Sequence, residues 1–136
     1  LLGLTRGSNR AHIVRAVLEA IAFQTYDVIR AMEADFGKSI VQLKVDGGAS
    51  ANNFIMQFQA DLLNISVLRP QEIETTALGA AYLAGLAVGY WKDKQELIQN
   101  TTVGRIFQGA MSKEERELKL NQWHRAVERA RSWEAE

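Results

Sequence analysis

Two adjacent glycines, Gly47 and Gly48, are the feature that most constrains how this chain folds. They separate a short apolar run at 40–45 from a segment at 51–64 whose apolar residues recur with helical spacing. A short apolar run bounded by glycines predicts a largely buried strand. Glycines permit positive φ angles and leave no Cβ between the backbone and a ligand. The segment therefore predicts a strand, a tight turn and a helix, with a backbone that a ligand can approach closely.

The predicted helix at 51–64 makes this turn a candidate nucleotide site. A helix N-terminus presents unpaired amides and the positive end of the helix dipole, which suit a phosphate. Asn52 and Asn53 can donate and accept hydrogen bonds, as recognition of adenine or ribose requires. A tight strand-to-helix connection explains the same residues without a ligand, and the run matches neither GxGxxG nor a P-loop. Both interpretations stay open from these residues alone.

Hydrophobic periodicity predicts a long first helix, which Ser8 or Asn9 caps and Gly37 ends. Its expected buried face consists of Val14, Val17, Ile21, Val28 and Met32. The elements expected after the glycine turn are a strand at 65–69, a helix through the uncharged stretch 77–91, a short helix at 93–98, a strand or extended crossing at 103–107 and a long last helix capped by Ser112. Thr75 or Thr76 is expected to cap the buried helix at 77–91. Strands alternating with helices over short connections are typical of parallel βαβ units, so we expect one helix-rich α/β unit.

Charge and composition exclude several classes of function. The 136 residues carry 16 basic and 16 acidic side chains, which argues against a dedicated nucleic-acid or membrane-surface binder. The chain has no Cys, and its two His, His12 and His124, lie outside any carboxylate cluster, so no metal held by this chain is expected. The longest uncharged stretch is too short to span a bilayer, and a cytoplasmic location is expected.

Several conspicuous side chains are given structural roles. We expect His12 to be a packing residue and Asp46 to accept amide hydrogen bonds within its own glycine turn. The three tryptophans, Trp91, Trp123 and Trp133, are expected to be core or interface anchors. The charged run at 113–117 is expected to be a solvated face.

Three runs of the chain resemble the FGGY family of carbohydrate kinases, in the actin-like ATPase superfamily. A family signature, whose upstream positions are missing here, is similar to the set Gly3, Leu4, His12, Ile13, Ala16, Val17, Leu18 and Glu19. The run VDGGASANNFIMQFQADLL resembles the family's adenosine motif. The run ETTALGAAYLAGLAVGYW resembles the following helix in members that phosphorylate glycerol. Because the chain also starts with Leu1 inside an apolar run, we expect it to be part of a longer protein.

The resemblance implies an α/β fold of the partial actin-like ATPase (ribonuclease H-like) type. Residues 1–136 would be a single incomplete domain, the C-terminal part of the second kinase domain, with a short parallel βαβα unit and a long C-terminal helix. By the same resemblance the chain keeps only the later strands of a five-stranded sheet. Open strand edges and uncovered helix faces then predict a homodimer, with the first helix as its seam.

The resemblance also implies a reaction, the transfer of the ATP γ-phosphoryl group to glycerol with Mg²⁺, giving glycerol 3-phosphate. Gly48 would contact the nucleotide through its backbone, Asn52 would contact the adenosine, and Gly47 and Ala49 would shape the turn. The catalytic base, the Mg²⁺ ligand and the sugar site belong to family segments that this chain lacks. We therefore expect ATP or ADP as ligand, the rest of the kinase as partner, no catalytic residue here, and no turnover by the chain alone.

Two alternatives remain open. The absence of a sugar pocket leaves room for another sugar or polyol kinase of the family. The chain could also be a non-catalytic nucleotide-binding or self-assembling actin-like module, because fold alone does not fix function.

Overall fold

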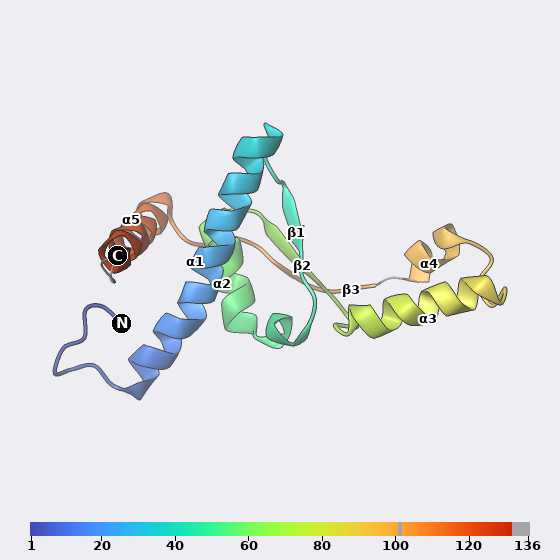
Figure 1. Cartoon of the computed structure of the whole chain (residues 1–136), viewed down its shortest axis with the longest axis horizontal. Coiled ribbons are helices and arrows are strands. Elements are labelled where there is room, and N and C mark those ends of the chain that lie inside the picture. The colour runs from blue at the N-terminus through green and yellow to red at the C-terminus, as the bar shows by residue number, and fades with distance from the viewer. Residues whose placement is uncertain (101, 132–136) are drawn as a thin grey trace, which may run out of the picture.

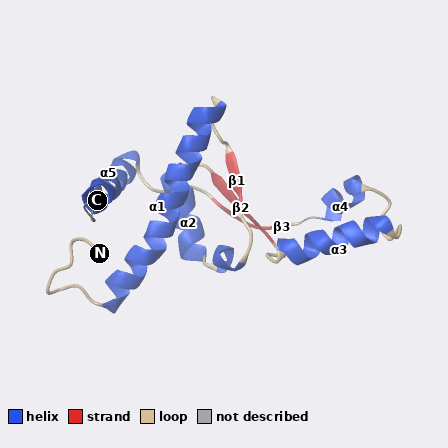
Figure 2. Ribbon diagram, viewed as in Figure 1, coloured by secondary structure: helices blue, strands red, loops and turns tan. Residues whose placement is uncertain are grey.

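The computed structural model describes residues 1–100 and 102–131. Its elements are α1 (Arg10–Phe36), β1 (Gln42–Lys44), the 3₁₀ helix η1 (Gly48–Ala51), α2 (Asn53–Leu63), β2 (Ser66–Pro70), α3 (Thr75–Ala87), α4 (Lys94–Asn100), β3 (Val103–Phe107) and α5 (Lys113–Ala130). The strands form one sheet in the order β1-β2-β3 (Figure 2). β1 and β2 are parallel, as the βαβ pattern predicts, and β3 pairs antiparallel with β2. The sheet is therefore mixed.

The helix α2 forms the centre of the molecule, between α1 and the sheet (Figure 1). On its sheet side, Ile55, Met56 and Ala60 pack with Val67 of β2 and Phe107 of β3. Its other side packs on α1 and α5. That second cluster contains Phe58 and Leu62 of α2 with Ala22 and Phe23 of α1, and Leu120 and Trp123 of α5 pack against it. The apolar spacing predicted at 54, 58 and 62 thus marks the core helix.

The ends of α1 are the ones the sequence predicts. The Asn9 side chain accepts hydrogen bonds from the amides of Ala11 and His12, at 3.0 and 3.3 Å. Gly37 ends the helix in the left-handed conformation, with φ 69°. The prediction for His12 is wrong, because this exposed side chain accepts from the Asn9 amide through Nδ1 and completes the cap.

The prediction of which face of α1 is buried is wrong. Val17 and Val28 are 53% and 58% exposed, and the other members of that set, Val14, Ile21 and Met32, are also exposed. The buried residues of α1 are Ala22, Phe23 and Ile29. The helix carries two adjacent apolar stripes, and α2 covers only one of them in this chain. We call the five exposed residues the outer α1 stripe.

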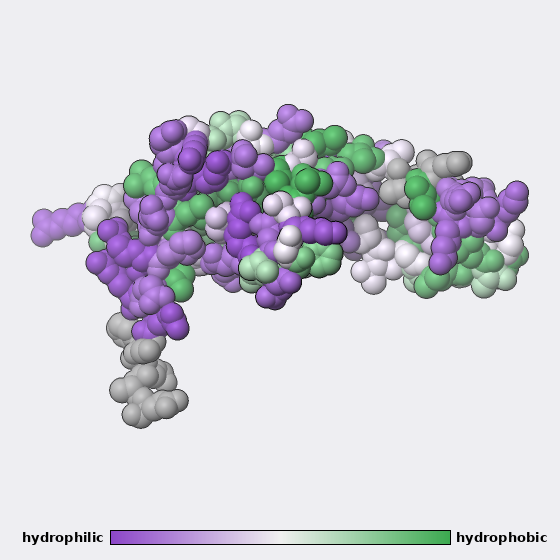
Figure 3. Space-filling view, turned by 90° about the horizontal axis from the view of Figure 1, so that it is seen from above, coloured by the Kyte–Doolittle hydropathy of each residue, from purple (hydrophilic) through white to green (hydrophobic). Residues whose placement is uncertain are grey.

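Two other segments are less buried than predicted. The strand expected at 40–45 shortens to β1. Gln42 and Lys44 are exposed because alternate side chains of a strand face opposite sides of the sheet, and of the three residues of β1 only Leu43 packs against the core. The helix α3 projects away from the sheet together with α4, and burial within it is confined to Gly85 (Figure 1). Apolar surface is visible at this end of the molecule (Figure 3), and Leu83 is 71% exposed. Neither Thr75 nor Thr76 caps α3, because Glu74 occupies the N-cap position without a side-chain bond.

The C-terminal helix α5 begins as predicted, with the Ser112 side chain accepting from the Glu115 amide at 3.1 Å. Trp123 anchors this helix, since its ring stacks on Phe23 with centroids 5.2 Å apart. Trp91 packs against Tyr82 at the end of α3, and Trp133 lies outside the described residues. The run at 113–117 is exposed except for half-buried Arg116. Within the described ranges, no helix combines the length and apolarity needed to cross a bilayer.

Candidate functional site

The glycine turn follows the parallel strand β1, where the chain leaves the sheet. Gly47 has φ 75°, a conformation that favours glycine. Its amide donates to the carbonyl of Ile73 at 2.8 Å. Its carbonyl accepts from both the amide and the hydroxyl of Ser50, at 3.0 and 2.7 Å. Ser50 is 1% exposed, so a buried side chain that the sequence interpretation missed fixes the shape of this turn.

The open part of the turn is the backbone of Gly48 and Ala49. Both residues are exposed, and their amides have no acceptor within the part of the chain that the structure describes. A Cβ built on Gly48 meets no atom within 4 Å. The exposed turn therefore has two neighbouring amide donors without a partner, from which an anionic or carbonyl oxygen could accept.

The sequence predicts unpaired amides at the N-terminus of α2, but Asn52 caps that end of the helix. The 3₁₀ helix η1 intervenes after the glycines, and Asn52 is the N-cap of α2. Its Oδ1 accepts from the amides of Phe54 and Ile55 at 3.0 and 3.3 Å. Those amides are satisfied within the helix, so the only polar group that the Asn52 side chain can offer a ligand is its Nδ2 donor.

Asp46 connects the turn to α3. The Thr75 hydroxyl donates to Oδ2 of Asp46, whereas the predicted bonds within the glycine turn are not made. A groove of about 300 Å³ runs beside this pair, and its lining also includes Leu68, Pro70 and Val103. The first residue of α3 is therefore linked to the turn through one carboxylate.

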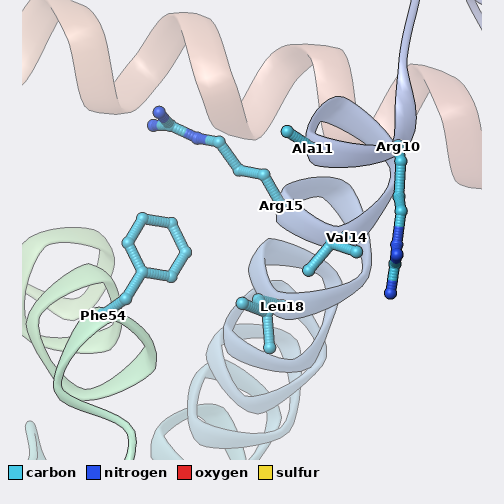
Figure 4. Close-up of a pocket in the computed structure, with 6 residues that line it drawn as sticks. All are labelled: Arg10, Ala11, Val14, Arg15, Leu18 and Phe54. Atoms are coloured by element: carbon cyan, nitrogen blue, oxygen red, sulfur yellow. The ribbon is translucent and has the colours of Figure 1, made fainter.

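A second, open groove lies between the first half of α1 and the start of α2 (Figure 4). It has a volume of about 640 Å³ and is lined by Arg10, Ala11, Val14, Arg15, Leu18 and Phe54. The Arg15 guanidinium lies over the Phe54 ring, 5.3 Å from its centroid, and Nε of Arg15 pairs with Glu19 at 2.8 Å. This groove was not predicted, although the apolar residues at 14 and 18 are one helical turn apart.

The residues near the turn do not fit a Mg²⁺ site. Mg²⁺ prefers octahedral oxygen coordination, usually with one or two carboxylates and the substrate phosphates. Asp46 is the carboxylate adjoining the turn, and it is engaged by Thr75. Across residues 1–100 and 102–131, no three His, Asp or Glu side chains are grouped as metal ligands. The described residues therefore give no basis for a step through the metal.

The fold and this turn are those of a known family. Residues 1–88 match the family model described as "FGGY family of carbohydrate kinases, C-terminal domain". The chain therefore belongs to the FGGY family of carbohydrate kinases.

Glycerol kinases are among the curated relatives that the chain matches. It is 60% identical over 136 residues to the glycerol kinase of Carboxydothermus hydrogenoformans and 58% identical over 134 residues to that of Clostridium botulinum (strain 657 / Type Ba4). These alignments cover 100% and 98% of this chain but 27% of each relative. The chain thus spans about a quarter of the length of these relatives.

A solved structure confirms the fold. The crystal structure of Plasmodium falciparum glycerol kinase with ADP superposes with a TM-score of 0.80 at 36% identity, covering 93% of this chain and 26% of that chain. The predicted family and the helix-rich α/β architecture are both confirmed.

Proposed function

We propose that this chain is the C-terminal part of an ATP-dependent glycerol kinase and forms the adenosine-binding wall of its active site. The observation that carries the proposal is the pair of exposed, unpartnered amides at Gly48 and Ala49. The presence of ADP with the related Plasmodium falciparum glycerol kinase and the 60% identity to a bacterial glycerol kinase support it. Residues 1–136 would belong to one domain that the rest of the kinase completes.

In this proposal each residue of the turn has a defined task. The amides of Gly48 and Ala49 donate to oxygens of the nucleotide near its α-phosphate and ribose, and Nδ2 of Asn52 donates to the adenosine. Gly47 holds the turn in its positive-φ conformation. Mg²⁺ would neutralise phosphate charge in the complete kinase, held by residues outside this chain.

The substitution Gly48→Val tests the nucleotide site. In the full-length kinase a branched side chain would occupy the open space above the amides, and loss of one charge-assisted hydrogen bond would raise the ADP dissociation constant about tenfold or more. Isothermal titration calorimetry measures it. Gly79→Val is the matched control, since a Cβ at Gly79 also meets no atom within 4 Å and the residue lies within α3 and not in the turn. An unchanged dissociation constant for Gly48→Val, with the melting temperature preserved, would contradict the proposal.

The isolated chain should show no kinase turnover. Phosphoryl transfer depends on positioning and charge stabilisation from groups that surround the γ-phosphate, and the turn alone supplies few of them. A coupled assay with glycerol, ATP and Mg²⁺ measures ADP production, which should equal the buffer blank. In the full-length protein, a preference for a sugar over glycerol would indicate another FGGY kinase. No turnover with any polyol or sugar would indicate the non-catalytic module.

The outer α1 stripe has a proposed partner as well. In the longer kinase we propose that the rest of the polypeptide covers it, and in the isolated chain a second copy does so, giving a homodimer. The edge strand β1 and the exposed apolar residues Val28 and Met32 support this association.

Sedimentation equilibrium of the isolated chain tests the homodimer. We expect a dimer mass that reverts to a monomer when Val28 and Met32 are both replaced by Lys. Both residues are more than half exposed, so the double substitution should change monomer stability by less than about 1 kcal/mol. A monomeric mass for the unsubstituted chain at all concentrations up to about millimolar would contradict the homodimer.

A further inference from the structure

The side chain of Arg69 on β2 is bound to the segment that joins the glycine turn to α2. Its Nη1 donates to the carbonyl of Ser50 at 2.7 Å, to the carbonyl of Ala51 at 3.2 Å and to Oδ1 of Asn53 at 3.0 Å. These acceptors lie 16 to 19 residues away in the sequence. One guanidinium therefore connects the central strand to the end of η1 and the beginning of α2.

The Arg69 guanidinium also lies over the aromatic ring of Phe107. Its central carbon lies 5.3 Å from the centroid of the Phe107 ring, and Phe107 is 2% exposed. The Phe107 ring belongs to the sheet-side core beneath α2. A cation over an aromatic face that is fixed by the core has little freedom to leave its acceptors.

The direction of these bonds relates Arg69 to the open amides. In a helical turn the carbonyls point toward the C-terminal end and the amides toward the N-terminal end. Arg69 binds the carbonyls of the last two residues of η1, while the open amides of Gly48 and Ala49 are at its beginning. A cation at the C-terminal end also offsets the partial negative charge that accumulates there. Fixing one end of so short a turn fixes the direction of the donors at the other end.

We propose that Arg69 is a positioning residue of the nucleotide turn, which it holds in the shape that presents the amides of Gly48 and Ala49 to the ligand. This inference rests on the proposed nucleotide-binding function of that turn. Arg69 acts through the backbone of η1 and is not assigned a contact with the nucleotide. Lysine cannot replace it, because an ammonium is a compact point charge that cannot reproduce the planar guanidinium stacked on Phe107.

The chain offers a matched control in Arg105. It is the register partner of Arg69 on β3, and its guanidinium carbon lies 4.7 Å from the centroid of the same Phe107 ring. Among the described residues Arg105 makes no hydrogen bond to the turn. The substitutions Arg69→Lys and Arg105→Lys thus each remove a guanidinium contact with the Phe107 ring, but only Arg69→Lys also removes the bonds to η1. Arg69→Met removes the charge as well.

The experiment uses the full-length kinase and two readouts. Without nucleotide, hydrogen–deuterium exchange of the hydrogen-bonded amides of Gly47, Ser50, Asn52, Phe54 and Ile55 should accelerate about tenfold in Arg69→Lys and remain at the original rate in Arg105→Lys. In steady-state assays, Arg69→Lys should raise the KM for ATP and the ADP dissociation constant about tenfold, with the KM for glycerol unchanged. A loss confined to the nucleotide distinguishes positioning of this turn from general destabilisation, which would affect both substrates.

Each outcome decides the proposal. Unchanged exchange in both Arg69 variants overturns it, as does an Arg105→Lys effect equal to that of Arg69→Lys. Faster exchange with unchanged nucleotide affinity also overturns it, provided that Gly48→Val weakens ADP binding. If Gly48→Val leaves ADP binding unchanged, the proposed function fails separately, and the exchange data alone decide whether Arg69 holds the turn.

Discussion

The indole Nε1 of Trp123 donates a hydrogen bond to Oδ2 of Asp27 over 2.7 Å, and this bond connects α5 to α1. The other carboxylate oxygen lies 3.1 Å from Nε2 of His124. The substitution Asp27→Ala would leave the half-buried indole donor without its partner. We expect it to lower the free energy of unfolding by about 1–2 kcal/mol, measured by urea denaturation.

The control for this prediction is His124→Gln. The His124 side chain is 54% exposed, so its loss should change stability by less than about 0.5 kcal/mol. Equal effects of the two substitutions would show that the indole bond contributes nothing beyond a surface contact.

The hydrogen bonds of the Glu33 carboxylate should make the stability of the chain fall at acidic pH. Its Oε1 accepts from the Ile40 amide at 2.7 Å, and its Oε2 pairs with Arg30. The Ile40 amide, and then Arg30, hold the pKa of Glu33 below its ordinary value of 4.5. A lowered folded-state pKa gives stability that is present above the unfolded pKa and lost as pH falls through the folded one.

We therefore expect Glu33→Gln to destabilise the chain at neutral pH and to have a shrinking effect as pH falls below 4.5. Urea denaturation at several pH values measures the difference between the two proteins. Glu117→Gln is the control, since the Glu117 side chain is 60% exposed. A difference that does not shrink as the pH falls below 4.5 would contradict the assigned hydrogen bonds, because protonation of Glu33 should progressively remove the ionised carboxylate that distinguishes the two proteins.

The packing around Gly85 on α3 leaves no room for even a methyl group at this position. A Cβ at this position would lie 2.1 Å from Cζ3 of Trp91, so Gly85→Ala must displace the indole. Overpacking of this kind costs about 1–3 kcal/mol. We expect faster hydrogen exchange at 82–92 with the sheet-side core unaffected.

The same helix provides a control with the opposite sign. A Cβ at Gly79 meets no atom within 4 Å, so Gly79→Ala should stabilise α3 by up to about 1 kcal/mol through helix propensity alone. Destabilisation by both substitutions would mean that α3 packs differently from the structure described.

The structural features that could be predicted are those set by residues close together in the sequence. Asn9 and Gly37 identify the ends of α1 because capping is a local interaction. The parallel pairing of β1 and β2 follows from the short crossover through α2. Which apolar stripe of α1 is covered depends on its packing partners, and no local pattern distinguishes Val28 from Ile29.

The candidate site is predictable to a smaller extent. The glycines locate the turn, and the family resemblance suggests its ligand. The roles of Ser50 and Arg69 could not be predicted, because a buried hydroxyl bound to the Gly47 carbonyl and a guanidinium on another strand have no sequence spacing that signals them. The capping role of Asn52 competes with its predicted role toward the ligand, and local capping satisfies the oxygen of its side chain.

The pairing of Pro70 with Val103 has a consequence for how this chain tolerates change in length. The chain leaves the sheet at Pro70 and returns beside it at Val103, so α3 and α4 form an insertion within what is otherwise a β2–β3 hairpin. The base of the insertion is closed by the Gln71 amide donating to the Thr102 carbonyl at 3.1 Å. Entropy of loop closure grows slowly with length, so residues beyond this base can be added or removed at little cost to the hairpin. Proteins with insertions or deletions between residues 76 and 100 should therefore keep the same strand register. The domain can gain new surface in this segment without a change in its core.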